Sequence, residues 1–244
     1  MPLDLPPPEA FRSVVGQYQV RKSAQQAQTQ PESSDTSNIP SDHLQIQHKP
    51  LLPPAGIYLQ SMAQVEQILQ ELVQSAFPEL VKEKLVLQPL QSRDVFFQSN
   101  FKPLSVLSQK PVYVIQVNPA LFERQLPLPA ARAILAHELA HTLDYHRHGL
   151  GGLAKVGWQV LFHNQHYEYR TDLQAIARGF GEGLIAYREW VYQQIPAADL
   201  AKKQKTYYQP AQIRQLMHLW EQAQAAGQAK STLQNWLKAP PFLP

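Results

Sequence analysis

Two histidines and a glutamate stand close together in the segment His137-Glu138-Leu139-Ala140-His141. Residues i and i+4 of an α-helix share one face, with Cβ atoms roughly 6 Å apart, so histidines at this spacing can each direct one nitrogen to a common ion. Histidine nitrogens bind tetrahedral zinc at about 2.0–2.1 Å. The glutamate lies one step round the helix, where it can reach a metal-bound water without being a ligand. We interpret the segment as the core of a zinc hydrolase site.

A third protein ligand must come from elsewhere, because a catalytic zinc ion usually has three protein ligands and one position for water. A third histidine six residues after the second is excluded, since that position is Arg147. Glu168 is our preferred third ligand, because Asp172 one turn later can accept the ring N–H of a ligating histidine. Asp172 itself, His163 and His166 remain alternatives.

The two histidines require a helix to position them. Apolar residues at helical spacing run from Ala131 to Leu143, and the two prolines just before this run suit a first helical turn. We expect the glycines that follow to end the helix, at Gly149, Gly151 and Gly152. The motif would then lie in the middle of a helix of ordinary length.

A second long helix is predicted over residues 166–194, where apolar side chains recur every three or four positions. A neighbouring stripe begins with Glu168 and Asp172 and continues with small residues that include Gly179 and Gly183. Glycine inside a helix is less favourable than alanine by about 1 kcal/mol, so we expect another backbone to pack closely there. If the histidine-bearing helix is that partner, the two acidic side chains are carried toward the histidines.

The remaining pattern predicts an α+β fold. Short β-branched and aromatic runs at 85–87, 94–97 and 112–117 are typical of strands in one small sheet. Helical spacing predicts a helix from residue 61 that ends before Pro78, and further helix beyond Pro196. We therefore expect a small β-sheet packed on the active-site helix and a long second helix, with a mostly helical C-terminal half.

Residues 1–54 are rich in proline, glutamine and serine, and the chain has 21 prolines against 10 glycines. Such a segment has too few large apolar side chains to offset its ordering entropy, so we expect it to be disordered or extended. We interpret it as a linker or tail, with a pro-segment that covers the active site as the alternative. Residues 55–244 are expected to form one zinc metallopeptidase domain.

Composition excludes several classes of protein. The chain has no cysteine, which excludes disulfides, thiolate ligands and a cysteine nucleophile. Its net charge is +3 with scattered lysines and arginines, so no nucleic-acid partner is expected. No apolar run approaches the roughly 20 residues of a membrane span, and residues 1–5 do not resemble an export signal. The expected compartment is the cytoplasm for the chain as written, or the periplasm or exterior if a leader was removed.

The metal motif and the acidic pair together resemble a known group of metallopeptidases. The matching residues are His137-Glu138-x-x-His141 and Glu168-x-x-x-Asp172. They look like the gluzincins, the thermolysin-like clan, and the tyrosine-rich setting of residues 167–175 is similar to the minigluzincin and prenyl-protein-protease branch. The resemblance covers about residues 110–190.

This resemblance implies roles for the matching residues. The two histidines and Glu168 would be the zinc ligands, Glu138 the general base, and Asp172 a hydrogen-bond acceptor for a ligating histidine. The segment Val112–Val117 would run along the cleft and pair with an extended substrate backbone.

The expected activity is that of a soluble zinc-dependent peptidase acting on peptides or proteins. Glu138 would take a proton from the attacking water and return it to the leaving amine. A His, Tyr or Arg side chain from outside the helix pair would stabilise the oxyanion. The candidates are Tyr207, Tyr208, Arg188 and His218.

Two other functions stay open from the sequence. One is a metal-binding scaffold or partner-recognition module on a peptidase fold, although an intact Glu138 argues against it, because a purely structural site needs closed coordination. The other is a zinc hydrolase of a non-peptide amide, since a fold does not dictate its substrate. The sequence does not predict an oligomeric state.

Overall fold

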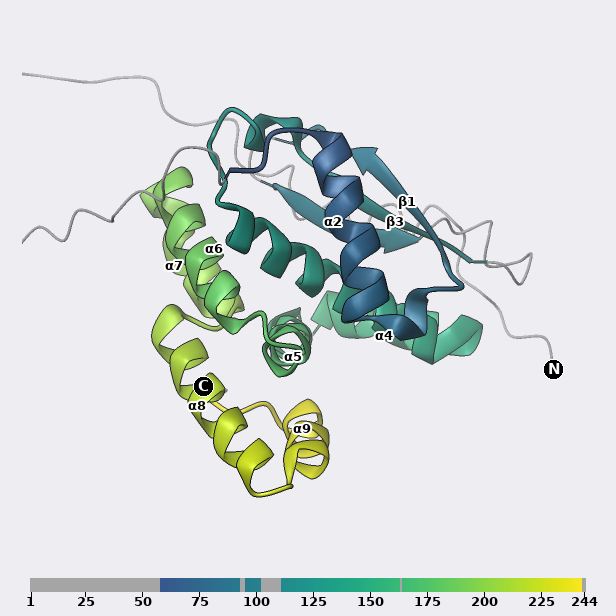
Figure 1. Ribbon diagram of the computed structural model, residues 1–244, viewed down its shortest axis with the longest axis vertical. Helices are drawn as coiled ribbons and strands as arrows, with labels where there is room; N and C mark the ends of the chain where they lie inside the picture. Colours follow the sequence, from purple (N-terminus) through teal and green to yellow (C-terminus); the bar gives the residue numbers. More distant parts are fainter. Residues whose placement is uncertain (1–57, 93–94, 102–110, 163, 243–244) are drawn as a thin grey trace, which may run out of the picture.

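The computed structural model describes residues 58–92, 95–101, 111–162 and 164–242 (Figure 1). The N-terminal segment 1–54 and His163 lie outside these residues. The elements in chain order are α2 (Met62–Ser75), η1 (Pro78–Leu80), β1 (Lys84–Pro89), β2 (Phe97–Phe101), β3 (Val112–Val117), η2 (Pro119–Leu121), α4 (Leu128–Phe162), α5 (Asn164–Ala177), α6 (Gly181–Gln194), α7 (Ala197–Thr206), α8 (Pro210–Ala225) and α9 (Ala229–Lys238).

Helix α2 packs on the sheet and confirms the first predicted helix. The Ser61 side chain accepts a hydrogen bond from the backbone N–H of Gln64 at 3.3 Å and so caps the helix start. Apolar side chains at helical spacing are buried on one face: Val65, Ile68, Leu69 and Leu72. They belong to a hydrophobic cluster shared with the sheet, α4 and α6.

The three predicted strands form one mixed sheet in the order β1-β3-β2, with β1 parallel and β2 antiparallel to β3. The strand expected at 94–97 begins at Phe97 instead and continues to Phe101. Strand β3 is central, so β1 and β2 occupy both of its edges. The expectation that Val112–Val117 pairs with a substrate backbone is therefore wrong. Strand β2, at the edge of the sheet, contacts α4.

Helix α4 is longer than the sequence predicts. It continues through Gly149, Gly151 and Gly152 to Phe162, so the expectation that these glycines end it is wrong. Glycine is unfavourable in a helix by about 1 kcal/mol relative to alanine, but it keeps its backbone N–H. Only proline removes that donor, and the next proline after Pro129 is Pro196, beyond the end of α4. The helix can therefore continue through the glycines.

The single helix expected over residues 166–194 is two helices, α5 and α6, that meet at a sharp turn. Gly179 has φ of 89°, in the left-handed region that favours glycine. The N–H groups of Gly179 and Phe180 donate to the carbonyls of Ile176 and Ala175, which is the Schellman pattern of a helix end. In Figure 1, α5 is seen end-on and α6 runs in a different direction.

The second predicted glycine does mark a close approach between backbones. A Cβ atom at Gly183 would overlap the carbonyl oxygen of Pro129 and lie 2.6 Å from the Cβ of Ala133. Both residues belong to the first turns of α4. This confirms that the histidine-bearing helix packs closely against the small-residue stripe at Gly183, whereas a Cβ at Gly179 would meet nothing within 4 Å.

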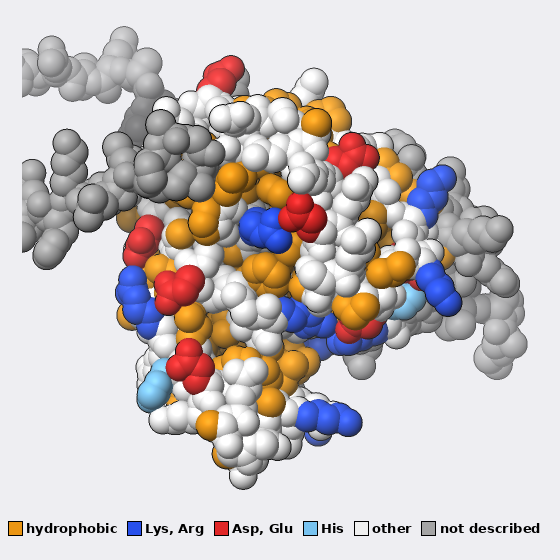
Figure 2. Space-filling view, in the orientation of Figure 1, with side chains coloured by type: hydrophobic (Ala, Val, Ile, Leu, Met, Phe, Trp, Pro, Cys, Tyr) orange, Lys and Arg blue, Asp and Glu red, His pale blue; other side chains and the backbone are white. Residues whose placement is uncertain are grey.

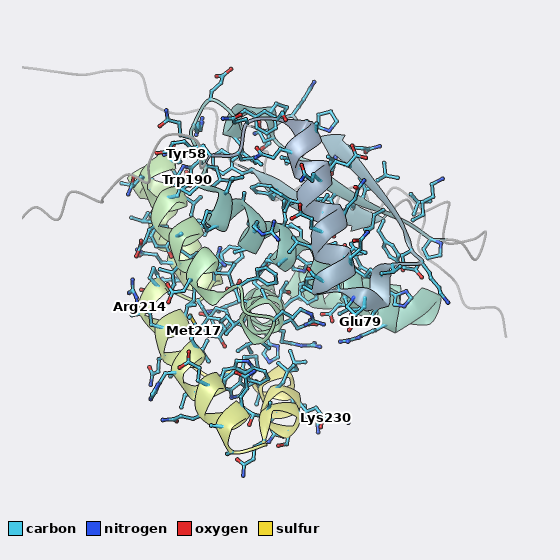
Figure 3. All side chains as sticks on the ribbon, in the orientation of Figure 1. Tyr58, Glu79, Trp190, Arg214, Met217 and Lys230 are labelled. Atoms are coloured by element: carbon cyan, nitrogen blue, oxygen red, sulfur yellow. The ribbon has the colours of Figure 1, made fainter. Side chains whose placement is uncertain are left out.

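The C-terminal half is helical, which together with the sheet confirms the α+β class. Helices α8 and α9 lie at the lower end of the molecule in Figure 1, and the indole rings of Trp220 and Trp236 pack 5.9 Å apart between them. Met217 of α8 reaches the start of α6, where its side chain fills the space next to Gly181 (Figure 3). A second hydrophobic cluster joins α5, α6 and α8.

Three further features concern the surface, the helices and the connections. Acidic and basic side chains are interspersed on the face that Figure 2 shows. None of the helices in the described part of the chain combines the length and apolar character that a membrane span requires. Tyr58 forms an isolated antiparallel β-bridge with Pro127, just before α4. The indole N–H of Trp190 donates to the backbone carbonyl of Arg124, so both residues lie near the start of α4 (Figure 3).

Candidate metal centre

Three ligand atoms from two helices converge beneath the sheet. The Nε2 atoms of His137 and His141, one turn apart on α4, are 3.1 Å from each other. The Oε2 atom of Glu168, on α5, lies 3.1 Å from the first nitrogen and 3.3 Å from the second. Among the described residues these side chains form the group that could hold a metal ion, and His166 does not belong to it.

The spacing of these atoms fits a small divalent cation. Two atoms that each lie about 2.0–2.1 Å from one ion at the tetrahedral angle are about 3.3 Å apart. The separations of 3.1, 3.1 and 3.3 Å between the three ligand atoms are close to that value. Two nitrogens and one carboxylate oxygen are also a common ligand set of catalytic zinc sites. The residues present therefore fit a metal ion with a fourth position left over.

Each histidine is oriented through its other ring nitrogen. Nδ1 of His137 lies 2.8 Å from Oδ1 of Asp172, and Nδ1 of His141 lies 3.3 Å from Oγ1 of Thr171. Thr171 also donates to the carbonyl of Tyr167 at 2.9 Å, which fixes its rotamer. With both Nδ1 atoms engaged, both Nε2 atoms face the centre, where they could bind a metal ion.

Arg188 extends this network beyond the ligands. Its guanidinium donates to both carboxylate oxygens of Asp172, at 2.8 and 2.9 Å. The two residues are almost fully buried, with exposures of 2% and 0%. Arg188 was a sequence candidate for oxyanion stabilisation, and its charge is instead compensated by the carboxylate that holds His137.

Charge around the centre favours ionised carboxylates. Burial by itself lowers the pKa of His137, but hydrogen bonds to Asp172 and Glu168 and the charges of these carboxylates raise it to about 9. Burial raises the pKa of Asp172, yet Arg188 and His137 lower it overall. Burial also raises the pKa of Glu168, but His141 and His137 stabilise its carboxylate and hold the pKa below its ordinary value. Two ionised carboxylates beside two imidazoles suit a bound cation.

Glu138 lies next to the three candidate ligands and does not belong to their group. Its side chain is buried, and burial raises the pKa of the carboxyl group against the opposing effect of the histidines. The backbone of Ser99 hydrogen bonds to this carboxylate, and the Ser99 hydroxyl lies 2.9 Å from that of Thr142 on α4. Strand β2 is thus joined to α4 directly beside Glu138.

A cleft of about 200 Å³ opens onto His137 and Glu138. It lies between β2, α4, α6 and α7, which supply all of its walls together with the short segments at their ends. Phe97 and Ile134 contribute apolar surface, whereas Arg188 and Tyr207 contribute polar groups. A molecule in this cleft would reach both the candidate ligands and the candidate base.

Of the two tyrosines named from the sequence, only Tyr207 lines the cleft. Its ring lies 6.1 Å from that of His137, and the guanidinium of Arg188 lies 4.5 Å from its centroid. Tyr208 points elsewhere, because its hydroxyl donates to the carbonyl of Pro241 and its ring stacks on Tyr169.

His218 also lies away from the centre. It is on the exposed side of α8, where its Nε2 is 2.9 Å from the side-chain amide of Gln222. The structure therefore brings together His137, His141, Glu168, Glu138, Asp172, Arg188 and Tyr207, and leaves His218 and Tyr208 outside.

Sequence reasoning missed three residues of the centre: Thr171, Ser99 and Thr142. Thr171 had a usable signal, because it lies three residues after Glu168 and so shares a face of α5 with it. Ser99 and Thr142 had none, since their contact joins a strand to a helix across 43 residues of chain.

Comparisons with models of known families, with curated proteins and with solved structures find no match to this chain. The geometry of the centre therefore carries the functional argument.

Proposed function

We propose that the chain is a zinc-dependent peptidase, with His137, His141 and Glu168 as zinc ligands. The observation that carries the proposal is the mutual separation of their three ligand atoms, 3.1 to 3.3 Å, next to a cleft that also exposes Glu138. A purely structural zinc site is closed by four protein ligands. Here three ligands and an adjacent carboxylate suit catalysis.

A bound zinc ion supplies acidity to a water molecule and polarises a carbonyl group. Glu138 accepts the proton of the attacking water and transfers it to the departing amine. Its buried position and the raised pKa of its carboxyl group suit a group that must both take up and release a proton. Ser99 holds its carboxylate from the side of β2.

Tyr207 is our candidate for the donor to the oxyanion. It lines the cleft beside His137, and burial raises the pKa of its hydroxyl well above 10, so the group remains a donor at neutral pH. The neighbouring guanidinium of Arg188 restricts the ring. A preorganised donor of this kind contributes about 10²–10³ in rate.

A peptide substrate is favoured over other amides by the sheet edge. Strand β2 pairs with β3 on one side, and within the described residues its other side has no strand partner. Phe97 of this strand lines the cleft. An extended peptide can add to such an edge through backbone hydrogen bonds.

Metal analysis and a chelator-sensitive cleavage assay test the proposal. We expect about one zinc ion per chain and cleavage of unfolded casein that a chelator abolishes. Glu138→Gln should retain stoichiometric zinc and lose turnover, because the ligands stay and the base is gone. Turnover in this variant would remove Glu138 from the chemistry, and zinc without any cleavage would favour the scaffold function.

The ligand assignments have their own test. His137→Ala and Glu168→Ala should lose zinc, measured by elemental analysis after dialysis against a weak chelator. His218→Ala is the matched control, because this histidine is exposed on α8 and should leave the zinc content unchanged. Full zinc in Glu168→Ala would contradict its role as a ligand.

A further inference from the structure

Ser99 lies in β2 with its main-chain groups directed toward the open edge of the sheet. The N–H of Asn118 donates to the carbonyl of Phe96 at 2.9 Å, so these two residues form a hydrogen-bonded pair between β3 and β2. Hydrogen-bonded and non-hydrogen-bonded pairs alternate along an antiparallel ladder, so Ser99 and Ile115 form a non-hydrogen-bonded pair. The N–H and carbonyl of Ser99 therefore point away from β3, to the side of β2 that has no strand partner within the described residues.

This outward-facing N–H meets the candidate base. The backbone of Ser99 forms a hydrogen bond to the side chain of Glu138 that favours the ionised carboxylate, as an N–H donor does. A glutamate side chain has several rotatable bonds, so its attachment to α4 alone does not fix where the carboxylate lies. The position of the Glu138 carboxylate in the cleft thus depends on the separation between β2 and α4 at this point.

Two buried hydroxyl groups fix that separation. The Oγ atom of Ser99 lies 2.9 Å from Oγ1 of Thr142, and the two residues are 8% and 0% exposed. Thr142 donates its only hydroxyl hydrogen to the carbonyl of Glu138 at 3.1 Å, so Ser99 must be the donor in the contact between the hydroxyls. These contacts form a closed loop that leads from the carboxylate of Glu138 through Ser99 and Thr142 to the carbonyl of Glu138.

We propose that the hydroxyl groups of Ser99 and Thr142 are positioning groups for the base: they hold β2 at the distance from α4 at which the Ser99 N–H directs the Glu138 carboxylate. Neither residue lines the cleft, so both act through Glu138. Displacement of a catalytic group by about 1 Å can reduce the rate by about 100-fold. This inference rests on the proposed peptidase function and adds two residues that the chemistry requires.

The kinetic test removes the contact between the hydroxyls from either side. Thr142→Val and Ser99→Ala both keep the backbone N–H of Ser99. We expect kcat for a synthetic peptide that spans a casein cleavage site to fall about tenfold in each, less than the 10²–10⁴ that a general base contributes, because the base is displaced but present. The KM value and the zinc content should stay unchanged.

Two further variants assign the effect to this one contact. The double variant Ser99→Ala/Thr142→Val should lose no more kcat than either single variant, because both substitutions remove the same hydrogen bond. Thr142→Ser, which retains a hydroxyl group, should restore the wild-type kcat.

Amide hydrogen exchange tests the same contact without a substrate. In the wild-type protein, with or without zinc, the Ser99 N–H should exchange slowly although it faces an open edge, because Glu138 accepts it. Thr142→Val should accelerate this exchange about tenfold, the effect of losing one hydrogen bond. The N–H of Gln98 points toward β3 and is the internal control, so its rate should not change. Nuclear magnetic resonance resolves the two amides.

Ile68→Val is the matched control for stability. Ile68 is buried on α2 and does not line the cleft. Loss of one methylene group from a buried isoleucine destabilises a fold about as much as loss of one hydrogen bond. This variant should keep the wild-type kcat and the wild-type exchange rate at Ser99.

The outcomes separate this inference from the peptidase function. Wild-type kcat in Thr142→Val and Ser99→Ala, or an equal fall in Ile68→Val, would overturn the inference and leave the peptidase intact. Faster exchange at Ser99 with unchanged kcat would also overturn it, because the hydroxyl contact would then be structural only. Absence of cleavage by the wild-type protein, together with faster exchange at Ser99 in Thr142→Val, would overturn the peptidase and support the positioning of Glu138 by the two hydroxyls.

Discussion

At the scale of single residues, the centre depends on a chain of contacts that starts far from the ligands. Arg188 fixes the carboxylate of Asp172 with two hydrogen bonds, and Asp172 fixes the ring of His137. The result is that the orientation of one candidate ligand on α4 is set by an arginine on α6.

Asp172→Asn should weaken metal binding without removing a ligand. The amide is a poorer acceptor for the Nδ1–H of His137, and loss of such a partner typically reduces metal affinity by 10–100-fold. Competition titration with a chromophoric chelator measures the change. Asp199→Asn, the same substitution on α7, is the control and should leave the affinity unchanged. Wild-type affinity in Asp172→Asn would contradict the orienting role.

Arg188→Met should destabilise the fold, because it leaves the carboxylate of Asp172 buried without its counter-ion. Loss of one partner of a buried ion pair reduces the free energy of unfolding by about 3–5 kcal/mol. Urea denaturation of the metal-free protein measures this. The double variant with Asp172→Asn should lose less than the sum of the two single changes, because the groups interact directly. Additive losses of unfolding free energy would contradict a direct interaction between Arg188 and Asp172.

At the scale of elements, local periodicity predicted most helices and strands correctly, because each depends on which face of a short segment is buried. Helix α2 and strand β3 are examples, and their bounds match the apolar pattern. The errors in the helices concern glycine. Its helix penalty of about 1 kcal/mol is small enough for packing to override in α4, whereas at Gly179 the left-handed backbone ends α5.

Only those residues of the centre that lie close together in the sequence could be predicted to lie close together in the structure. His137 and His141 are one turn apart, and Glu168 and Asp172 are one turn apart on the next helix. The contact between Asp172 and Arg188 was not predictable, because in the continuous helix that the sequence suggests they would be about 24 Å apart. The sharp turn at Gly179 changes the direction of the chain and makes the contact possible.

Gly183→Ala should disturb the centre as well as the fold. The added methyl group would meet Pro129 and Ala133, so α6 must move away from α4, at a cost of about 1–3 kcal/mol. Because α6 carries Arg188, metal affinity should fall as well. Thermal unfolding and chelator competition measure the two effects.

Gly227→Ala is the control for this prediction. Gly227 lies in the turn between α8 and α9, where its φ is 68° and a Cβ would have open space. Strain in the left-handed region should reduce stability by about 1–2 kcal/mol with no change in metal affinity. Equal effects of both variants on the metal would contradict the packing argument.

At the scale of the whole molecule, the centre lies where two hydrophobic clusters meet. One cluster joins α2, the sheet, α4 and α6, and the other joins α5, α6 and α8. An ion held by α4 and α5 would therefore connect both halves of the described structure.

Removal of the metal should lower the melting temperature of the whole domain in one step. A ligand at 100 times its dissociation constant stabilises the native state by about 2.7 kcal/mol. For a chain of this size that corresponds to about 5–10 °C. Differential scanning calorimetry with and without chelator measures the shift, and Glu168→Ala should show none. A wild-type melting temperature that the chelator leaves unchanged would contradict a metal ion held jointly by α4 and α5.

The corner at Gly179 limits which changes in chain length the centre can tolerate. One residue inserted between Asp172 and Gly179 would rotate the preceding part of α5 by about 100° relative to the corner. The carboxylate could then no longer meet both His137 and Arg188. The same insertion in the connection between α8 and α9 leaves these three residues in place. We therefore expect deletions and insertions to be excluded from residues 168–188 and accepted near residue 227.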